Sequence, residues 1–386
     1  MRIVRLLGLL VMLVWSVGGF VAAQDESGPQ DNSWAVRATL DTSLPGGVRG
    51  TVSLLSPDGQ HIAQMTPISL CVYNRNIVEE TCFSLDSQDI SPDAGSLRWS
   101  PDSRYLTFSE NFFTMFVHST IWLADTETGE LRALIEPPAD RRISFTADDW
   151  PAIDLLPQWS PDGSLYFLRF SRSDGVDEPT TLYRFDDISE PPVEVGALHD
   201  HATGSTYALA AHNEQIAFNV HIPAPPEQQG AWLWALNEDE PVNLHPTENA
   251  EPIVSIDFSP DGTQLLLTDY RLNFVAVEDP SSSAFSLLVA GDDEPQTIDT
   301  ERYVLSAGWS PDGSALAYIV FGGVDADSNG LYITSEPGTP GQLVLAGDFY
   351  APTAPGLQPL VWANDNTLLI GQRETFTALI VELGRK

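Results

Sequence analysis

The stretch "DADSNGLYITSE", Asp325 to Glu336, has the strongest ligand-binding pattern in the chain, because it fits the calcium-loop formula D-x-D-x-N-G-x5-E. In such a loop the last residue curls back to the ion. Here "GLYIT" has strand character, and an extended run would place the Glu336 carboxylate about 20 Å beyond Gly330. We therefore predict a smaller Ca²⁺ site on Asp325, Asp327 and Asn329, with an ordinary solvated loop as the alternative.

Other patterns that could support chemistry are weak. His199, Asp200 and His201 form the only local histidine cluster, but "LHDHATGS" reads as a loop, and the sequence offers no third ligand. Neighbouring carboxylates such as Asp148 and Asp149 are typical of solvated turns. The sequence contains no G-x-S-x-G nucleophile elbow. We predict no catalytic residues, and no cofactor other than a structural Ca²⁺.

Cys71 and Cys82 are the only two cysteines. They flank "VYNRNIVEET", which reads as two short strands around 74–76. Antiparallel pairing centred between Asn76 and Ile77 would place the cysteines directly opposite each other, at a separation that a disulfide can bridge. Without a nearby histidine the two thiols do not make a zinc site. The sequence predicts a Cys71–Cys82 disulfide.

One short phrase recurs along the chain and indicates the elements that hold these residues. Clear copies are "RWSPDSRYLTFS" (98–109), "QWSPDGSLYFLRF" (158–170), "DFSPDGTQLLLTD" (257–269) and "GWSPDGSALAYIV" (308–320), with weaker copies at 55–63, 209–218 and 362–370. Their Asp positions are spaced 44 to 60 residues apart, which indicates a repeat architecture of seven units. Within the phrase, Ser caps a turn, Pro presets φ, and Gly takes a positive φ. Asn213 and Asn366 replace that Gly acceptably, whereas Ser103 fits it less well.

Each repeat contains four short apolar strands joined by polar turns. Two strands flank the phrase, and a second hairpin follows, as in "TIWLADTETGELRAL" and "GLYITSEPGTPGQLVL". Antiparallel units of four strands at this spacing predict an all-β fold, a seven-bladed β-propeller. Six blades are the alternative, if the weak unit at 209–244 merges with a neighbour.

The "WSPDG" phrase resembles the WD40-like (PD40-type) repeat of TolB-like β-propellers, which also occurs in the propeller domains of prolyl-oligopeptidase-like enzymes. The resemblance covers roughly residues 35–386 and implies a propeller fold without implying an activity. Only about ten polar residues, "QDESGPQDNS" (24–33), separate the predicted signal-peptide cleavage site after Ala23 from the first strand. The α/β domain that precedes the propeller in TolB is therefore not expected, and neither is the hydrolase domain of the enzymes.

The two ends of the repeat array are predicted to meet. The last unit has strands near 357–362, 367–372 and 376–383 and lacks a fourth, while "SWAVRATLDT" (33–42) has strand character. We expect this N-terminal strand to complete the last blade, because pairing the ends removes exposed sheet edges. The aromatic residue of the phrase is expected to pack between blades, as a core position rather than a ligand platform: Trp99, Trp159, Phe258, Trp309 and Trp362.

The N-terminal segment predicts export. Arg2 and Arg5 precede an apolar stretch at 6–20, and Val21-Ala22-Ala23 supplies small residues for a signal peptidase. We predict a signal peptide at 1–23, a flexible linker at 24–33 and a β-propeller domain at 34–386, with an uncleaved membrane anchor as the alternative. The mature chain would then be periplasmic, extracellular or on the cell surface, without a membrane span.

The net charge of −36, from 18 Lys and Arg against 54 Asp and Glu, excludes nucleic acid as a natural partner. Long loops opposite the phrase turns would form the variable face of the propeller, where recognition usually takes place. The candidate binding residues on these loops are Phe112, Phe113, Arg141, Arg142, Trp150, Phe349 and Tyr350. We expect an exported, monomeric, non-catalytic binding or scaffold propeller that recognises a protein or peptide. The alternative is a hydrolase or lyase acting on glycan or peptide in the central funnel.

Overall fold

The computed structural model describes most of the chain after residue 32. The described residues are 33–45, 51–112, 117–138, 142–144, 147–199, 206, 208–221, 224–246, 253–269, 285–289, 296–299, 301–320, 328–350, 360–364 and 366–386. The predicted signal peptide and linker lie outside the described residues, apart from Ser33. Within the described part, no helix combines the length and apolar character that crossing a membrane requires.

The described residues form seven antiparallel sheets, which we number as blades in chain order. Blade 1 holds β2 (Val52–Leu55), β3 (His61–Met65), β4 (Ser69–Asn74) and β5 (Glu79–Ser84). Blade 2 holds β6 (Arg98–Trp99), β7 (Tyr105–Ser109), β8 (Ile121–Asp125) and β9 (Glu130–Ala133). Blade 3 holds β10 (Trp150–Trp159), β11 (Leu165–Ser173), β13 (Thr180–Phe185) and β14 (Val193–His199), and the short β12 (Val176–Asp177) pairs with β11. Blade 4 holds β15 (Leu209–His212), β16 (Gln215–Val220), β17 (Gly230–Ala235) and β18 (Val242–Pro246).

The remaining blades follow the same order. Blade 5 holds β19 (Ile253–Phe258), β20 (Gln264–Asp269), β21 (Phe285–Val289) and β22 (Gln296–Thr297), and blade 6 holds β23 (Val304–Trp309), β24 (Leu316–Val320), β25 (Gly330–Thr334) and β26 (Gln342–Ala346). Blade 7 holds β27 (Phe349–Tyr350), β28 (Thr367–Gln372), β29 (Thr377–Arg385) and β1 (Trp34–Pro45). Three short 3-10 helices accompany the strands: η1 (Asp86–Gln88), η2 (Ala94–Ser96) and η3 (Pro226–Gln228). The predicted all-β propeller of four-stranded antiparallel blades is confirmed, and the weak unit at 209–244 forms a sheet of its own.

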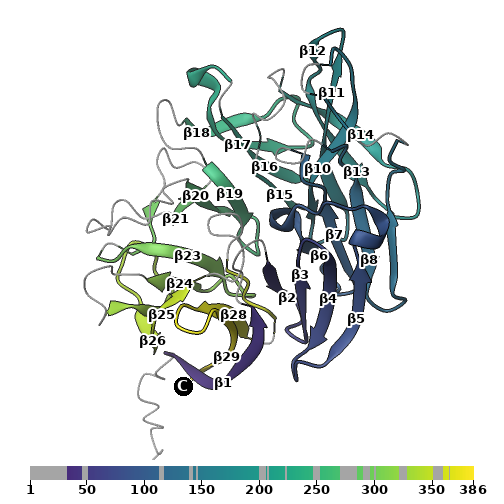
Figure 1. The fold of residues 1–386 in the computed structure, drawn as a ribbon. Coiled ribbons are helices and arrows are strands. Elements are labelled where there is room, and N and C mark those ends of the chain that lie inside the picture. The colour runs from purple at the N-terminus through teal and green to yellow at the C-terminus, as the bar shows by residue number, and fades with distance from the viewer. Residues whose placement is uncertain are drawn as a thin grey trace, which may run out of the picture. The chain divides into compact units, whose positions relative to one another are not determined.

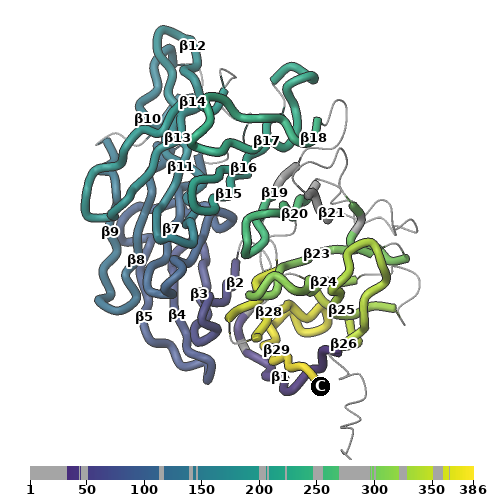
Figure 2. Tube along the Cα trace, turned by 180° about the vertical axis from the view of Figure 1, so that it is seen from behind, coloured from purple at the N-terminus to yellow at the C-terminus, as the bar shows by residue number. Residues whose placement is uncertain are grey.

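The N-terminal strand completes the last blade, as predicted. β1 pairs antiparallel with β29 from Trp34 opposite Arg385 onward, and both views show the two strands side by side (Figures 1 and 2). The Trp34 ring meets Trp362 edge-on at 5.0 Å between ring centroids. The inner strand of this blade was predicted at 357–362, and residues 357–359 lie outside the described residues. Trp362 bridges to Leu368, as Trp309 pairs with Leu316 in blade 6, and β27 pairs with the other end of β28.

Apolar side chains fill the spaces between neighbouring blades. Each successive pair of blades shares a buried cluster, and blades 7 and 1 share one that contains Leu44, Leu55 and Ile380. The repeated aromatic residues belong to these clusters, as predicted. Trp99 shows how they act, because its indole N–H donates to the Leu54 carbonyl of the preceding blade at 3.1 Å. The core therefore lies between blades, and burial of this apolar surface holds adjacent sheets together.

The repeated turns have one shared geometry. In four of them the Ser hydroxyl donates to the Asp carboxylate two residues on, as Ser310 does to Asp312 at 2.8 Å. The fourth turn position has a positive φ in all seven repeats, including the non-glycine residues Ser103, Asn213 and Asn366 at 62°, 52° and 64°. The Ser103 hydroxyl also accepts the Asp58 N–H of the neighbouring turn at 3.1 Å, a contact that glycine would not make.

Replacing the turn glycine of blade 3 tests this geometry. Gly163 has a φ of 91°, and a Cβ built there would meet nothing within 4 Å. We expect Gly163→Ala to lower the free energy of unfolding by roughly 1–2 kcal/mol through backbone strain alone. Gly163→Asn should cost less, because asparagine already occupies this position in two other repeats. Urea denaturation of the two variants would measure the difference, and an equal or larger loss for Asn would contradict the explanation.

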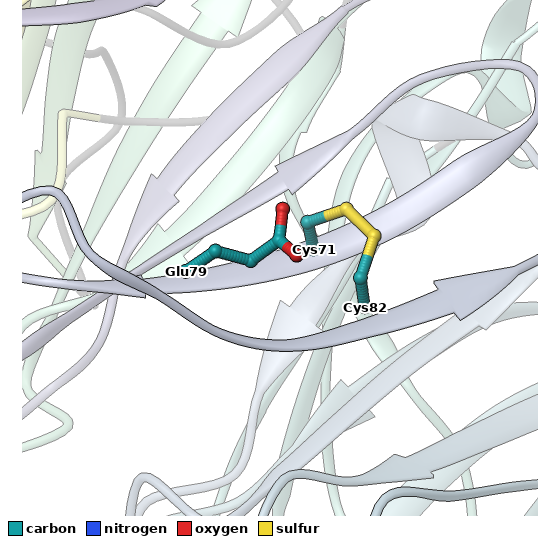
Figure 3. Close-up of side chains that lie close together, drawn as sticks. All are labelled: Cys71, Glu79 and Cys82. Carbon is teal, nitrogen blue, oxygen red and sulfur yellow. A yellow bond between two sulfur atoms is a disulfide. The ribbon is translucent and has the colours of Figure 1, made fainter.

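The predicted disulfide is present. β4 and β5 pair in the predicted register, with Cys71 opposite Cys82, and the two sulfurs are bonded (Figure 3). Closing this short loop stabilises the edge hairpin by about 3 kcal/mol on the chain-entropy account. Glu79 lies beside the sulfurs and makes the trio resemble a metal cluster. The bonded sulfurs carry no thiolate, so the trio does not bind a metal as thiolate sites do.

Candidate functional site

A groove crosses blade 3 at the end of β11 that lies away from the repeated turn. It has a volume of about 660 Å³, and its walls come from β10, β11, β13 and β14. Trp150, one of the predicted binding residues, lines it together with Arg169, Arg172 and Tyr183. Because all these side chains project from paired strands rather than from loops, the groove is a rigid feature of the blade.

Arg169 is fixed at the inner side of the groove. Its guanidinium donates to both Asp154 carboxylate oxygens, at 2.7 and 3.0 Å, and lies 4.3 Å from the centre of the Tyr183 ring. The Asp154 side chain is only 2% exposed. Burial raises the pKa of this carboxyl, against the lowering effect of the Arg169 hydrogen bonds. The pair is a buried, bidentate interaction that neutralises Arg169.

Arg172 has the same arrangement nearer to solvent. It donates to Asp177 at 2.8 Å and lies 4.5 Å from the centre of the Trp150 ring. Both arginines of the groove are therefore paired with aspartates and stacked on aromatic rings. The remaining charged groups of the lining are carboxylates, Asp149, Glu178 and Glu194. The described lining thus presents an excess of negative charge.

The other predicted binding residues have varied positions. Phe112 is 1% exposed and packs edge-on against Trp150 at 5.7 Å, so it supports the groove from within. Phe349 is 6% exposed in the core between blades 6 and 7. Tyr350 is half-buried, and burial raises its pKa. Arg142 is exposed, and its backbone forms an isolated antiparallel β-bridge with Val117. Phe113 and Arg141 lie outside the described residues.

The predicted calcium site falls at the edge of the described chain. Asp325 and Asp327 lie outside the described residues, so this site stays a prediction. Asn329 is buried, and its side-chain amide donates to the Asp348 carboxylate. The strand that follows is β25, which confirms that "GLYIT" is extended rather than part of a closed calcium loop. Of the histidine cluster, only His199 is described, and its ring nitrogen lies 2.8 Å from the Thr206 hydroxyl.

A second cavity, of about 410 Å³, lies where the inner strands of six blades converge near the repeated turns. Aromatic side chains of the repeat line it: Trp99, Trp159, Phe258, Trp309 and Trp362. Two charged residues of the lining come from different blades, Arg98 from β6 and Asp257 from β19. Burial lowers the pKa of Arg98 to about 10 and raises the pKa of Asp257 to about 6, and each charge partly offsets the shift of the other.

Sequence reasoning missed Arg98 and Asp257, although the repeat contains a signal for them. Both stand immediately before the aromatic residue of the phrase, in "RWSPD" and "DFSPD". The same position in other repeats holds Leu54, Gln158 and Val361, and all three also line the cavity. This position points to the central cavity, and comparing it across repeats would have revealed one cation and one anion among neutral residues.

No protein-family model matches the sequence, and no functionally curated protein matches it. Solved structures do match. A chain of the mitotic checkpoint complex aligns with a TM-score of 0.54 at 13% identity, over 98% of this chain and 99% of that chain. Oligogalacturonate lyase in complex with manganese aligns with a TM-score of 0.56 at 12% identity, over 92% and 98% of the two chains. The β-propeller domain of the trilobed protease from Pyrococcus furiosus gives 0.49 at 17% identity, over 87% and 98%. At such identities the likeness shows the fold alone.

Proposed function

We propose that this protein is a non-catalytic binding propeller that recognises a basic peptide segment of a protein partner in the groove of blade 3. The observation that carries the proposal is the set of side chains in the groove. Both arginines are already paired with Asp177 and Asp154, and their guanidinium groups lie over the Trp150 and Tyr183 rings. What the groove leaves for a ligand is the negative charge of Asp149, Glu178 and Glu194.

The charges indicate which peptides fit. Glu178 and Asp149 are exposed at the rim, and Glu194 accepts a hydrogen bond from the Tyr183 hydroxyl at 3.0 Å. A lysine or arginine side chain entering the groove meets these carboxylates and pairs with them. The net charge of −36 adds a long-range attraction for basic partners and repels acidic ones.

We further propose that the chain is a TolB-like propeller that acts outside the cytoplasm. The shared Ser-Pro-Asp-Gly turn geometry supports the repeat type, and the Cys71–Cys82 disulfide supports an oxidising compartment. The signal peptide at 1–23 belongs to this proposal. Mass spectrometry of the mature protein would locate its N-terminus, and a chain that still begins at Met1 would contradict cleavage.

Binding of matched synthetic peptides tests the groove. A lysine-rich peptide should bind, and its affinity should fall with added salt, whereas the same peptide with glutamate in place of lysine should not bind. Glu178→Gln/Glu194→Gln should weaken binding about tenfold, which corresponds to about 1.4 kcal/mol. Glu130→Gln/Glu238→Gln removes the same charge from exposed sites elsewhere and serves as the control. Equal weakening by both double variants would show that only net charge matters and would overturn the groove as the site.

A second candidate function rests on the central cavity. Asp257, with a pKa of about 6, has the proton affinity of a general base near neutral pH, and Arg98 could neutralise a substrate carboxylate. This pair suits a lyase better than a glycosidase, since Asp257 is the only carboxylate in the described lining and glycosidases use two. Product formation from acidic glycans or peptides, lost in Asp257→Asn, would favour this reading over the binding propeller.

A further inference from the structure

The central cavity is a separate site from the groove of blade 3. Its walls are the inner strands of blades 1, 2, 3, 5, 6 and 7 at the repeated-turn end, whereas the groove lies at the opposite end of β11. A volume of about 410 Å³ is within the range of small-molecule sites. Arg98 and Asp257 are the only charged residues of the described lining, among apolar, aromatic and neutral polar side chains.

Arg98 is held rigidly, with donor capacity left over. Its Nε donates to the Gln158 side-chain oxygen at 3.0 Å, and its Nη1 donates to the carbonyls of Gly95 and Leu97, both at 2.9 Å. These three bonds fix the plane of the guanidinium. Within the described residues its Nη2 makes no hydrogen bond. A fixed guanidinium with unused donors is suited to a carboxylate.

Asp257 interacts with Arg98 without touching it. The two charges influence each other's ionisation, yet no Arg98 nitrogen comes within 4.0 Å of an Asp257 oxygen in the described part of the chain. Asp93, at the N-cap of η2, has a larger charge effect on Arg98 than Asp257 has, and it does not line the cavity. Within the cavity the Asp257 carboxylate therefore has no contacting cation, and the Nη2 donors of Arg98 stay unused.

We propose that this cavity binds a small zwitterion, with its carboxylate on Arg98 and its ammonium on Asp257. Such a ligand forms one ion pair with Arg98 and another with Asp257, and it displaces water from both side chains. The apolar walls contribute further, because Trp159 and Trp309 line the cavity and lower the local dielectric around both ion pairs. A ligand with only one charge leaves the opposite protein charge uncompensated and binds more weakly.

Titration with ω-amino acids of increasing length, from glycine to 6-aminohexanoate, tests the proposal. Tryptophan fluorescence of the full chain reports binding, because four tryptophans line the cavity. We expect one chain length to give a saturable change. The carboxylic acid and the amine of the same length should bind at least tenfold more weakly. Single-charge analogues that bind as tightly as the zwitterion, or no saturable change with any probe, would overturn the proposal.

Substitutions of Arg98 and Asp257 test whether these two residues bind the zwitterion. Arg98→Met and Asp257→Asn should each weaken binding of the best zwitterion at least tenfold. The matched controls, Arg104→Met and Asp239→Asn, replace residues that do not line the cavity and should leave binding unchanged. If Arg98→Met does not fold, Arg98→Lys keeps the charge but loses the three fixed bonds, and it should still bind more weakly than the wild type. Wild-type affinity in folded Arg98 and Asp257 variants would place the ligand elsewhere. Because the peptide assay probes different residues, failure of either proposal leaves the other intact.

Discussion

Asp257→Asn is expected to make the protein more stable at pH 7 to 8, by up to about 3 kcal/mol. Burial raises the pKa of Asp257 from 3.8 to about 6, and a shift of about 2 units corresponds to about 3 kcal/mol. In the unfolded chain the carboxyl ionises freely near pH 4, whereas ionisation in the folded state is resisted. The folded state therefore loses stability as the pH rises from about 4 through 6, and asparagine removes that loss.

Urea denaturation of the wild type and Asp257→Asn between pH 3.5 and 8 measures the effect. The difference in free energy of unfolding should be small below pH 4, grow through pH 6 and then stay constant. Arg98 lowers the pKa of Asp257 but does not restore it to the ordinary value, so its charge is already included in the expectation. Asp239→Asn, an exposed aspartate, should show no such growth. A variant less stable than the wild type at pH 8 would mean that the ionised carboxylate contributes favourably to the fold.

Arg169→Met is expected to destabilise the protein by about 3–5 kcal/mol, because it leaves the buried Asp154 carboxylate without a charge partner. Asp154 is 2% exposed and receives two hydrogen bonds from Arg169. Methionine fills most of the space of the arginine side chain but donates no hydrogen bond to Asp154. Thermal or urea unfolding at pH 7 gives the magnitude directly.

Arg172→Met is the matched control. Arg172 forms the same kind of pair with Asp177 and stacks on Trp150, but Asp177 is 16% exposed and can be hydrated when the arginine is lost. The expected cost is about 1 kcal/mol. Adding Asp154→Asn to Arg169→Met should recover part of the stability, since it removes the buried, unpaired carboxylate charge of residue 154. Equal costs for the two arginine variants would show that burial of Asp154 is not what sets the energy.

The repeated phrase made the fold readable from sequence, because its constraints are local. Asn213 and Asn366 could be assigned a positive φ from residue type alone, and the structure shows it. The register that joins Cys71 to Cys82 followed from the alternation of a short hairpin. Strand β1 was assigned to blade 7 by counting strands, which is also a matter of local pattern. Phe349 and Tyr350 were assigned to a loop, and their pairing with the end of β28 depends on contacts that the local pattern does not contain.

The candidate sites were harder to predict, because their residues meet only through the ring. Arg98 and Asp257 are distant in sequence and enter one cavity because their blades share a central axis. Trp150 was predicted as a binding residue and does line a groove, but its partners Arg169 and Tyr183 lie on strands, whereas the predicted binding residues were all assigned to loops. Phe112 was predicted in the same way and is buried beneath Trp150. The sequence shows where aromatic residues stand in the chain. Whether their side chains are exposed depends on residues that other parts of the fold place around them.

The pairing of β1 with β29 also affects the order in which the blades can fold during synthesis. A hydrogen bond from Arg37 to the Arg385 carbonyl joins residues 348 positions apart, so the first strand to be synthesised must wait for the last before it finds its partner. Blades 1 to 6 contain their own strands and can assemble as the chain emerges, while blade 7 cannot. Bringing together such distant segments is entropically costly and slow. Until the two strands pair, β1 and then the outer edge of β29 stay exposed, and association with a second chain competes with completion of the ring.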